Sequence, residues 1–136
     1  MKIVVLDAQT VTKGDLPLDG LARFGERQVY DLTPPELIAE RVADADIVLC
    51  NKTKLCADNL VGADHLKYIG LFATGYNNID TEYAKTHGIT VCNAGSYSTD
   101  AVAQQTFGFI LNHYTRIADY DRFVKADGWL ESKTFS

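Results

Sequence analysis

The chain has 136 residues, of which 46% are hydrophobic and 23% charged, so it can bury the core of an ordinary globular domain. Its net charge of −5 argues against a nucleic-acid or anionic-membrane surface, since such surfaces need clustered lysine and arginine. No apolar run approaches the roughly 20 residues of a membrane span, and we expect no signal peptide, because Met1-Lys2 leads directly into the first predicted strand. The three cysteines lack CxxC spacing, so we expect reduced thiols and a cytoplasmic protein.

Short apolar segments alternate with helical patterns along the first two thirds of the chain. Strands are predicted at 3–6, 28–31, 46–50, 68–72 and 89–92, and helices at 18–24, 57–63 and 81–86. A further helix is predicted with Thr33 as its N-cap and Pro34 as its first residue. This alternation predicts an α/β fold, with a flavodoxin-like five-stranded parallel sheet in the order 2-1-3-4-5.

A long helix is predicted at about 99–118, and it has more apolar surface than a short chain can cover. One stripe at helical spacing contains Ala103, Phe107, Ile110, Leu111, Tyr114 and Ile117. Val102 and Phe109 lie on another side, so two surfaces require burial. The chain then becomes polar and stops without a further strand, so we expect it to be a fragment of a longer protein.

The fold class indicates where a ligand would bind, because open parallel sheets bind ligands beyond the carboxyl ends of their strands. Three loops qualify, at 7–10, 51–54 and 73–77. Gly75 permits a positive φ and close approach, so the N–H groups of Thr74 and Gly75 can converge on an anion; alternatively, Gly75 only forms a tight turn. Lys52 can supply a positive charge for a small acid, or it is simply solvated.

Other kinds of site find less support in the residues. Asp7 ends the first strand, but a phospho-receiver domain also needs an acid after the third strand, where Asn51 stands. His65, His87 and His113 lie on separate elements without carboxylate partners, so we interpret them as structural or solvated and expect no metal site. Asp80 is predicted to cap the helix that starts at Thr81. Neither GxGxxG nor GxxxxGK[ST] occurs. The residues alone therefore indicate a carboxylate-binding α/β domain with an unpaired helix.

Three segments resemble a known family. FATGYNNID, GITVCN and SYSTDAVAQQTFGFIL together resemble the D-isomer-specific 2-hydroxyacid dehydrogenases, and NKTKL is closest to the glycerate dehydrogenase (hydroxypyruvate reductase) branch. The resemblance implies that 1–98 form most of a flavodoxin-like substrate-binding domain. It implies that 99–136 form the opening helix and dimerisation arm of a truncated Rossmann domain that binds NAD.

The resemblance also implies roles for individual residues. The N–H groups of Thr74 and Gly75 would bind the carboxylate of a small 2-hydroxy or 2-keto acid. Asn51, Lys52 and Tyr97 would lie near that substrate.

Thr74 and Val102 would lie near the nicotinamide of NAD. The family's Gly-rich dinucleotide loop and its catalytic Arg, Glu and His lie further along the family sequence, so no catalytic residue is expected in this chain. We therefore expect an inactive fragment of an NAD-dependent dehydrogenase that is a homodimer at full length. The alternative is a stand-alone regulatory module that binds small carboxylates and forms a homodimer through the long helix.

Overall fold

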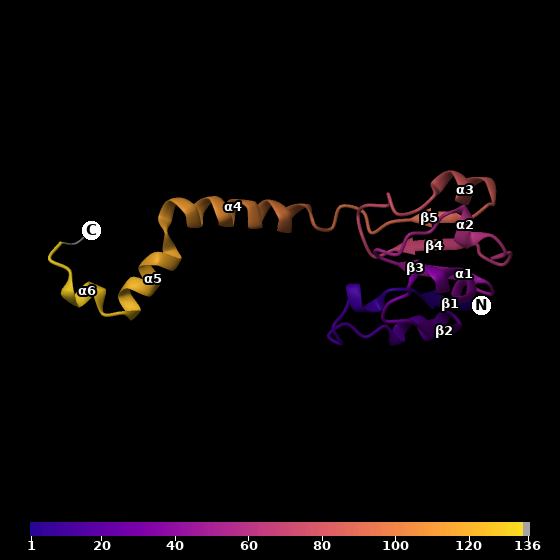
Figure 1. Ribbon diagram of the computed structural model, residues 1–136, viewed down its shortest axis with the longest axis horizontal. Coiled ribbons are helices and arrows are strands. Elements are labelled where there is room, and N and C mark those ends of the chain that lie inside the picture. The colour runs from indigo at the N-terminus through magenta and orange to yellow at the C-terminus, as the bar shows by residue number, and fades with distance from the viewer. Residues whose placement is uncertain (135–136) are drawn as a thin grey trace. The chain divides into compact units, whose positions relative to one another are not determined.

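The computed structural model describes residues 1–134, and the chain divides into two compact units, Met1–Ser96 and Tyr97–Ser136 (Figure 1). Of the segment expected to form the dimerisation arm, residues 135 and 136 lie outside the described residues. The first unit contains the sheet. The second, in its described residues 97–134, contains only helices and their connections.

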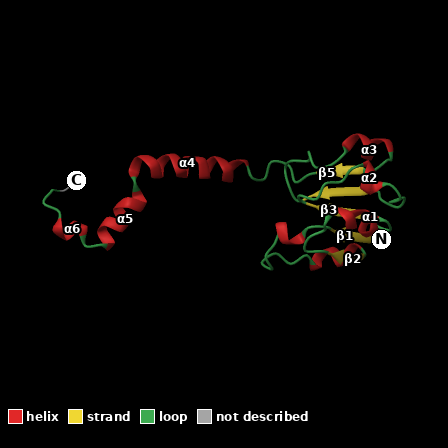
Figure 2. Cartoon of the chain, viewed as in Figure 1, coloured by secondary structure: helices red, strands yellow, loops and turns green. Residues whose placement is uncertain are grey.

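The first unit is built on a five-stranded parallel sheet (Figure 2). Its strands are β1 (Lys2–Val5), β2 (Glu26–Val29), β3 (Ile47–Cys50), β4 (Tyr68–Leu71) and β5 (Thr90–Cys92). They are arranged in the order β2-β1-β3-β4-β5, which confirms the predicted topology. Because every pair is parallel, the carboxyl ends of all five strands lie along one edge of the sheet.

Short helices connect the strands, and several are tighter than expected. The 3₁₀ helices are η1 (Ala8–Thr10), η2 (Asp19–Phe24) and η3 (Pro35–Leu37), and the α-helices are α1 (Ile38–Val42), α2 (Ala57–Leu60) and α3 (Thr81–Thr86). The segment predicted as a helix at 18–24 is therefore a 3₁₀ helix, and the helix predicted at 57–63 ends earlier, at Leu60.

The predicted N-cap at Thr33 is wrong. The Thr33 hydroxyl donates to the carbonyl oxygen of Leu6 at 2.6 Å and accepts from Arg41 Nη1 at 2.7 Å. The helix instead begins after Pro34, whose apolar side chain has no acceptor for the first N–H groups of the helix. By contrast, Asp80 caps α3 as predicted, since its Oδ1 accepts from the N–H of Tyr83 at 2.9 Å.

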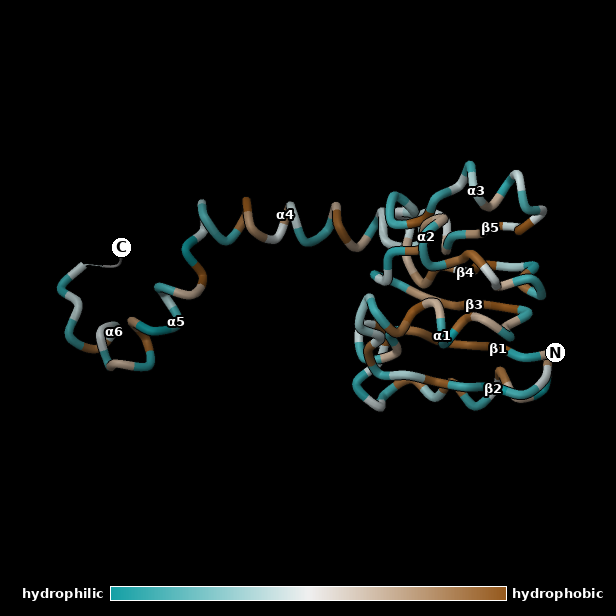
Figure 3. Tube along the Cα trace, turned by 45° about the vertical axis from the view of Figure 1, so that its right-hand side comes forward, coloured by the Kyte–Doolittle hydropathy of each residue, from teal (hydrophilic) through white to brown (hydrophobic). Residues whose placement is uncertain are grey.

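The core lies on both faces of β1, β3 and β4, whose near-continuous apolar runs are typical of central parallel strands. Figure 3 shows β1 and β3 as mostly hydrophobic along their length. The largest fully buried side chains are those of Ile3, Leu6, Leu55, Leu60, Ile69, Val4, Val5, Val42, Val48 and Cys50. Asp7 is the one buried polar or charged residue among the described residues.

The second unit consists of α4 (Thr99–Thr115), α5 (Ile117–Lys125) and α6 (Gly128–Glu131). The expected single helix at 99–118 is interrupted at Arg116. This residue has a left-handed backbone conformation, with a φ of 52°, and α4 ends before it. Every residue of α4 is exposed, including Phe107, Phe109 and Tyr114. Within residues 1–134, no helix is both long and apolar enough to cross a bilayer.

Candidate functional site

The loops that follow β3 and β4 are joined to each other beyond the sheet. The N–H of Phe72 donates to the carbonyl of Cys50 at 2.9 Å, where the two strands end. Further along, the N–H of Leu55 donates to Asn78 O at 2.9 Å, and the N–H of Asp80 donates to Leu55 O at 2.8 Å. These bonds hold the two loops side by side at the edge where open parallel sheets bind ligands.

Asp7 organises the loop that follows β3. Only 2% of this residue is exposed. Its Oδ1 accepts from the N–H of Asn51 at 2.8 Å, and its Oδ2 accepts from the N–H groups of Lys52 at 2.7 Å and Thr53 at 2.8 Å. The Thr53 hydroxyl also donates to Oδ2, at 2.9 Å. The carboxylate therefore accepts three consecutive backbone N–H groups of this turn.

This role for Asp7 was missed in the sequence, where Asp7 was considered only as an acidic residue of a phospho-receiver site. An acidic residue directly after a run of apolar strand residues was the available signal. Such a carboxylate lies at the edge of the core, and a buried charge needs several donors.

The other polar residues of this loop have different surroundings. The Asn51 side chain donates to Thr10, at 2.9 Å to Oγ1 and 3.2 Å to the carbonyl, so its amide nitrogen is already bonded. Lys52 is exposed, and its ammonium has no ion-pair partner within 4.0 Å in the part of the chain described here.

A cavity of about 380 Å³ is lined by residues that follow β1, β2 and β3, beside the point where the strand order reverses. Its lining consists of Asp7, Thr10, Leu32, Thr33, Pro35, Ile38, Lys52, Thr53, Lys54 and Asn59. Lys52 and Lys54 contribute two positive charges to this wall, and the single carboxylate of Asp7 is fully hydrogen-bonded. This part of the edge therefore favours an anion.

Thr74 and Gly75 follow β4, and both are exposed. The Thr74 hydroxyl donates to Gly95 O at 2.6 Å, and the side-chain amide of Asn93 donates to Thr74 O at 2.7 Å. Among the described residues, the backbone N–H groups of Thr74 and Gly75 donate to no other group. Two backbone donors are thus available for an anionic ligand, in a loop fixed by its side-chain and carbonyl bonds.

Gly75 does not adopt the positive φ that a glycine permits. The glycines with positive φ in the described chain include Gly88 and Gly95, at 69° and 66°, but not Gly75. A Cβ added at Gly75 would meet only Asn77 Oδ1, at 3.4 Å. The open space above Gly75 allows a ligand to approach, while Gly95 in the neighbouring loop provides the left-handed turn.

Tyr97 and Val102 belong to the second unit, where 70% and 61% of their surfaces are exposed. Their expected places beside the substrate and the nicotinamide remain predictions.

The described histidines and cysteines do not assemble into a site. His87 stacks on Tyr83 with ring centroids 3.9 Å apart, at the C-terminus of α3. Within residues 1–134, no three His, Cys, Asp or Glu side chains are grouped so as to hold a metal ion. Burial, together with the nearby Asp7 carboxylate, raises the pKa of the Cys50 thiol to about 12. A thiol with so high a pKa is not a nucleophile near neutral pH.

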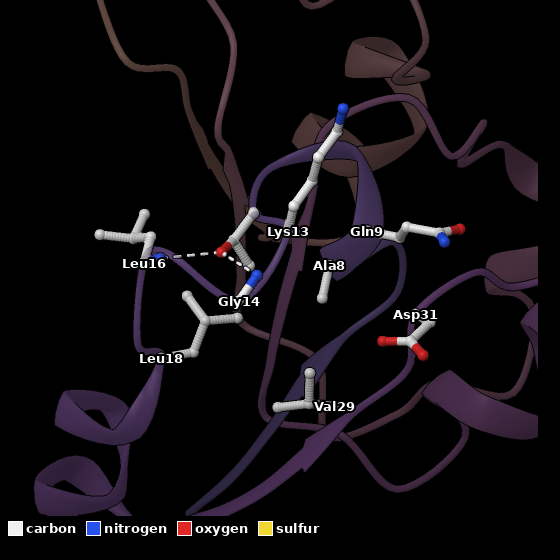
Figure 4. Close-up of a pocket in the computed structure, with 9 residues that line it drawn as sticks. Ala8, Gln9, Lys13, Gly14, Leu16, Leu18, Val29 and Asp31 are labelled. Carbon is white, nitrogen blue, oxygen red and sulfur yellow. Dashed lines mark hydrogen bonds between the residues drawn. The ribbon is translucent and has the colours of Figure 1, made fainter.

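A second cavity, of about 480 Å³, lies beside the loop after β1 and the end of β2 (Figure 4). It is lined by Ala8, Gln9, Thr12, Lys13, Gly14, Leu16, Leu18, Val29 and Asp31. Figure 4 shows the Lys13 side chain extending away from Leu18 and Val29, while Asp31 contributes a carboxylate. This cavity is therefore less suited to an organic acid than the edge beside Lys52 and Thr74.

Comparison with known proteins identifies the family. The family model described as "D-isomer specific 2-hydroxyacid dehydrogenase, catalytic domain" matches residues 3–132. The chain belongs to this family. The resemblance of the three segments noted in the sequence is thereby confirmed.

Individual relatives agree with this assignment. The chain is 37% identical to a hydroxypyruvate reductase of Blautia hydrogenotrophica over 132 residues, and 33% identical to a glycerate dehydrogenase of Methylorubrum extorquens over 139 aligned positions. These alignments cover 95% and 98% of this chain but only 41% and 42% of the two relatives. The chain thus spans about two fifths of the length of these curated relatives.

A solved structure supports the fold. An acyclic imino acid reductase, in complex with NADPH and D-Arg, superimposes with a TM-score of 0.76 at 25% identity. The match covers 93% of this chain and 41% of that one. It thus extends over nearly the whole of this dehydrogenase-family chain.

Proposed function

We propose that this chain forms the substrate-carboxylate half of a nicotinamide-dependent oxidoreductase that interconverts a D-2-hydroxy acid and its 2-keto acid. The observation that carries the proposal is the pair of exposed, unbonded N–H groups of Thr74 and Gly75 at the carboxyl end of β4. Glycerate and hydroxypyruvate are the proposed substrates, because a glycerate dehydrogenase and a hydroxypyruvate reductase are 33% and 37% identical to this chain.

The proposed chemistry of binding follows from the site. The N–H groups of Thr74 and Gly75 donate to the two carboxylate oxygens, and charge-assisted bonds of this kind are stronger than neutral ones. The Lys52 ammonium adds a positive charge from the adjoining loop, and Asn51 and Tyr97 complete the proposed substrate contacts. The chain's own part in the reaction is to hold the acid in one orientation, which lowers the entropic cost of hydride transfer.

The nicotinamide cofactor, proposed to be NAD, would contact only a few residues of this chain. The 136 residues contain no GxGxxG loop for a dinucleotide, so its adenosine and phosphates have no matching group here. Thr74, with its free N–H, and the exposed apolar Val102 are the proposed neighbours of the nicotinamide. When bound, the cofactor supplies or accepts the hydride.

Two assignments of the sequence analysis remain proposals. Residues 1–98 and 99–136 are proposed to be the substrate-binding domain and the start of the nucleotide-binding domain of a homodimer. The division into Met1–Ser96 and Tyr97–Ser136 supports a boundary near this point. The proposed cytoplasmic location is supported by the free thiols of Cys50, Cys56 and Cys92.

The binding proposal can be tested by titrating the ¹⁵N-labelled chain with D-glycerate. We expect saturable shifts of the Thr74 and Gly75 amide resonances. A matched titration with glycerol, which has the hydroxyls but no carboxylate, should leave these resonances unchanged. Equal responses to both compounds, or none at Thr74 and Gly75, would refute the carboxylate site.

The catalytic proposal needs a separate experiment. NADH oxidation with hydroxypyruvate should be absent for residues 1–136. If the reading frame continues past the codon for Ser136, its full product should turn over at a rate on the order of 1–10³ s⁻¹. Turnover by residues 1–136 alone would show that the chain is not merely half a site. A stop codon directly after Ser136 would favour the stand-alone carboxylate-binding module instead.

A further inference from the structure

We propose that Asp7 is a positioning residue for substrate binding, which sets the geometry of the loops carrying Lys52 and Thr74 without touching the substrate. The inference rests on the proposed function, since it concerns how the same carboxylate site is held together. The role is carried by the bonds around a single carboxylate at the end of β1.

The first step concerns the loop after β3. Three consecutive N–H groups, of Asn51, Lys52 and Thr53, lie 2.7–2.8 Å from the Asp7 oxygens. Only 2% of Asp7 is exposed, so water has little room to replace it as their acceptor. Three donors that converge on one point require a negative or strongly accepting group there, because leaving them unpaired in the interior is costly. The Asp7 carboxylate thus determines the backbone path of the loop.

This path has a consequence for Lys52. Its N–H is directed to Asp7, while its side chain is exposed and has no ion-pair partner in the described part of the chain. The carboxylate therefore anchors Lys52 through the main chain and leaves its ammonium available for an acid.

The second step connects Asp7 to the loop after β4. Thr53, which gives Asp7 both an N–H and a hydroxyl bond, accepts from the Asn78 side-chain amide through its carbonyl at 2.8 Å. Asn78 O in turn accepts from the N–H of Leu55 at 2.9 Å. Asn78 stands four positions after Thr74 in the same loop. One buried carboxylate is thus linked, through Thr53 and Asn78, to both loops of the proposed site.

Asp7→Asn is the direct test, because it keeps the shape and removes the charge. An asparagine presents one acceptor and one donor group, so at least one of the three N–H groups would face an N–H₂. We expect roughly tenfold weaker D-glycerate binding, measured by the shifts of the Thr74 and Gly75 amides. We also expect faster hydrogen exchange at the amides of residues 51–53, with protection in β3 and β4 retained.

Asp46→Asn is the matched control. Asp46 also accepts a backbone N–H, that of Lys2, at 2.7 Å, but it precedes β3 at the opposite edge of the sheet. This variant should change stability without changing D-glycerate affinity. Thr53→Val provides a second test, since it removes only the hydroxyl bond to Asp7. It should weaken binding less than Asp7→Asn does, while preserving the fold.

The outcomes separate this inference from the proposed function. The positioning role is refuted if the unaltered chain binds D-glycerate at Thr74 and Gly75 and both variants, Asp7→Asn and Thr53→Val, bind it as tightly as the unaltered chain does. If Asp7→Asn does not fold, an unchanged affinity in Thr53→Val refutes it in the same way. If the unaltered chain does not bind D-glycerate at all, the proposed function fails and the inference fails with it. An equal loss of affinity in Asp46→Asn would show that Asp7 acts only through global stability.

Discussion

The Thr74 hydroxyl donates to the carbonyl oxygen of Gly95 at 2.6 Å, and this bond ties the loop after β4 to the loop after β5. The Asn93 side-chain amide returns a bond to Thr74 O at 2.7 Å. Thr74 is therefore held through its hydroxyl and its carbonyl, while its N–H donates to nothing in the described chain. The proposed anion-binding donor thus belongs to a residue whose other polar groups are already occupied.

Thr74→Val should weaken D-glycerate binding. Valine has the shape of threonine but lacks the hydroxyl, so the bond to Gly95 is lost while the backbone N–H remains. Because the loop is exposed, we expect a cost in unfolding free energy of no more than about 1 kcal/mol, measured by urea denaturation. The affinity for D-glycerate should fall roughly threefold or more, equivalent to about 0.7 kcal/mol.

Thr106→Val is the matched control for this change. It removes a similar bond of a hydroxyl to a carbonyl, from Thr106 to Val102 O at 2.8 Å in α4. Affinity should be unchanged in this variant. The role assigned to the Thr74 hydroxyl would be refuted if both variants bound the acid as tightly as the unaltered chain.

Gly75→Ala and Gly95→Ala should differ in stability. Gly75 lies outside the left-handed region and has room for a Cβ, whose nearest neighbour would be Asn77 Oδ1 at 3.4 Å. Gly95 has a φ of 66°, where a side chain is strained by roughly 1–2 kcal/mol. Urea denaturation should therefore show a loss of about 1 kcal/mol for Gly95→Ala and a change within about 0.5 kcal/mol for Gly75→Ala. Equal losses in the two proteins would contradict this assignment of the turn.

The buried thiol of Cys50 should make the chain less stable at alkaline pH. Burial, with a further contribution from Asp7, raises its pKa from 9.0 to about 12 in the folded chain. Between these two values the unfolded chain has lost the proton and the folded chain retains it. The unfolding free energy should therefore fall as pH rises, by up to about 1.4 kcal/mol per pH unit. Below pH 9 this contribution should be fully present.

Other groups titrate in the same range, so the measurement is a difference. Urea denaturation of the unaltered chain and of Cys50→Ala, each at several pH values from 8 to 11, isolates the contribution of this thiol. The variant should be less stable at pH 8, because of the lost packing, but should have the shallower alkaline slope. Parallel slopes would show that Cys50 ionises as easily in the folded chain as in the unfolded one.

The second unit should make the chain self-associate. The exposed fractions of Phe107 and Phe109 are 63% and 67%, and an apolar surface of this kind favours association in water. We expect sedimentation velocity to show association that increases with concentration, together with binding of a hydrophobic dye. Replacing both residues by serine should reduce both signals, whereas Asn112→Ser on the same helix should not. A monomer without dye binding at all concentrations would contradict this expectation.

Local signals in the sequence predicted the features that depend on neighbouring residues. The start of α3 at Thr81 was predicted correctly, because Asp80 bonds an N–H only three residues away. The strand order followed from the alternation of short apolar strands and helices, which leaves few ways to cover a parallel sheet on both faces. The loops at the carboxyl edge followed in turn from that order.

The errors occurred where a distant group competes for a side chain or a backbone donor. Threonine is a residue type favoured at helix N-caps, but the Thr33 hydroxyl donates to Leu6 O, 27 residues away. The glycine required for a left-handed turn is Gly95 rather than Gly75, because the loop after β5 provides the turn beside the site. Neither fact has a signature within a few residues in the sequence.

The sequence by itself determined the fold class, the family resemblance and the edge of the sheet at which a ligand would bind, since these depend on local periodicity and on short motifs. Only the tertiary structure decided that Asp7 holds the loop of Lys52. Its backbone partners stand 44 to 46 residues further along the chain. A hydrogen bond acts over about 3 Å, so its partners become known only when the parallel pairing of β1 and β3 has brought the two loops together.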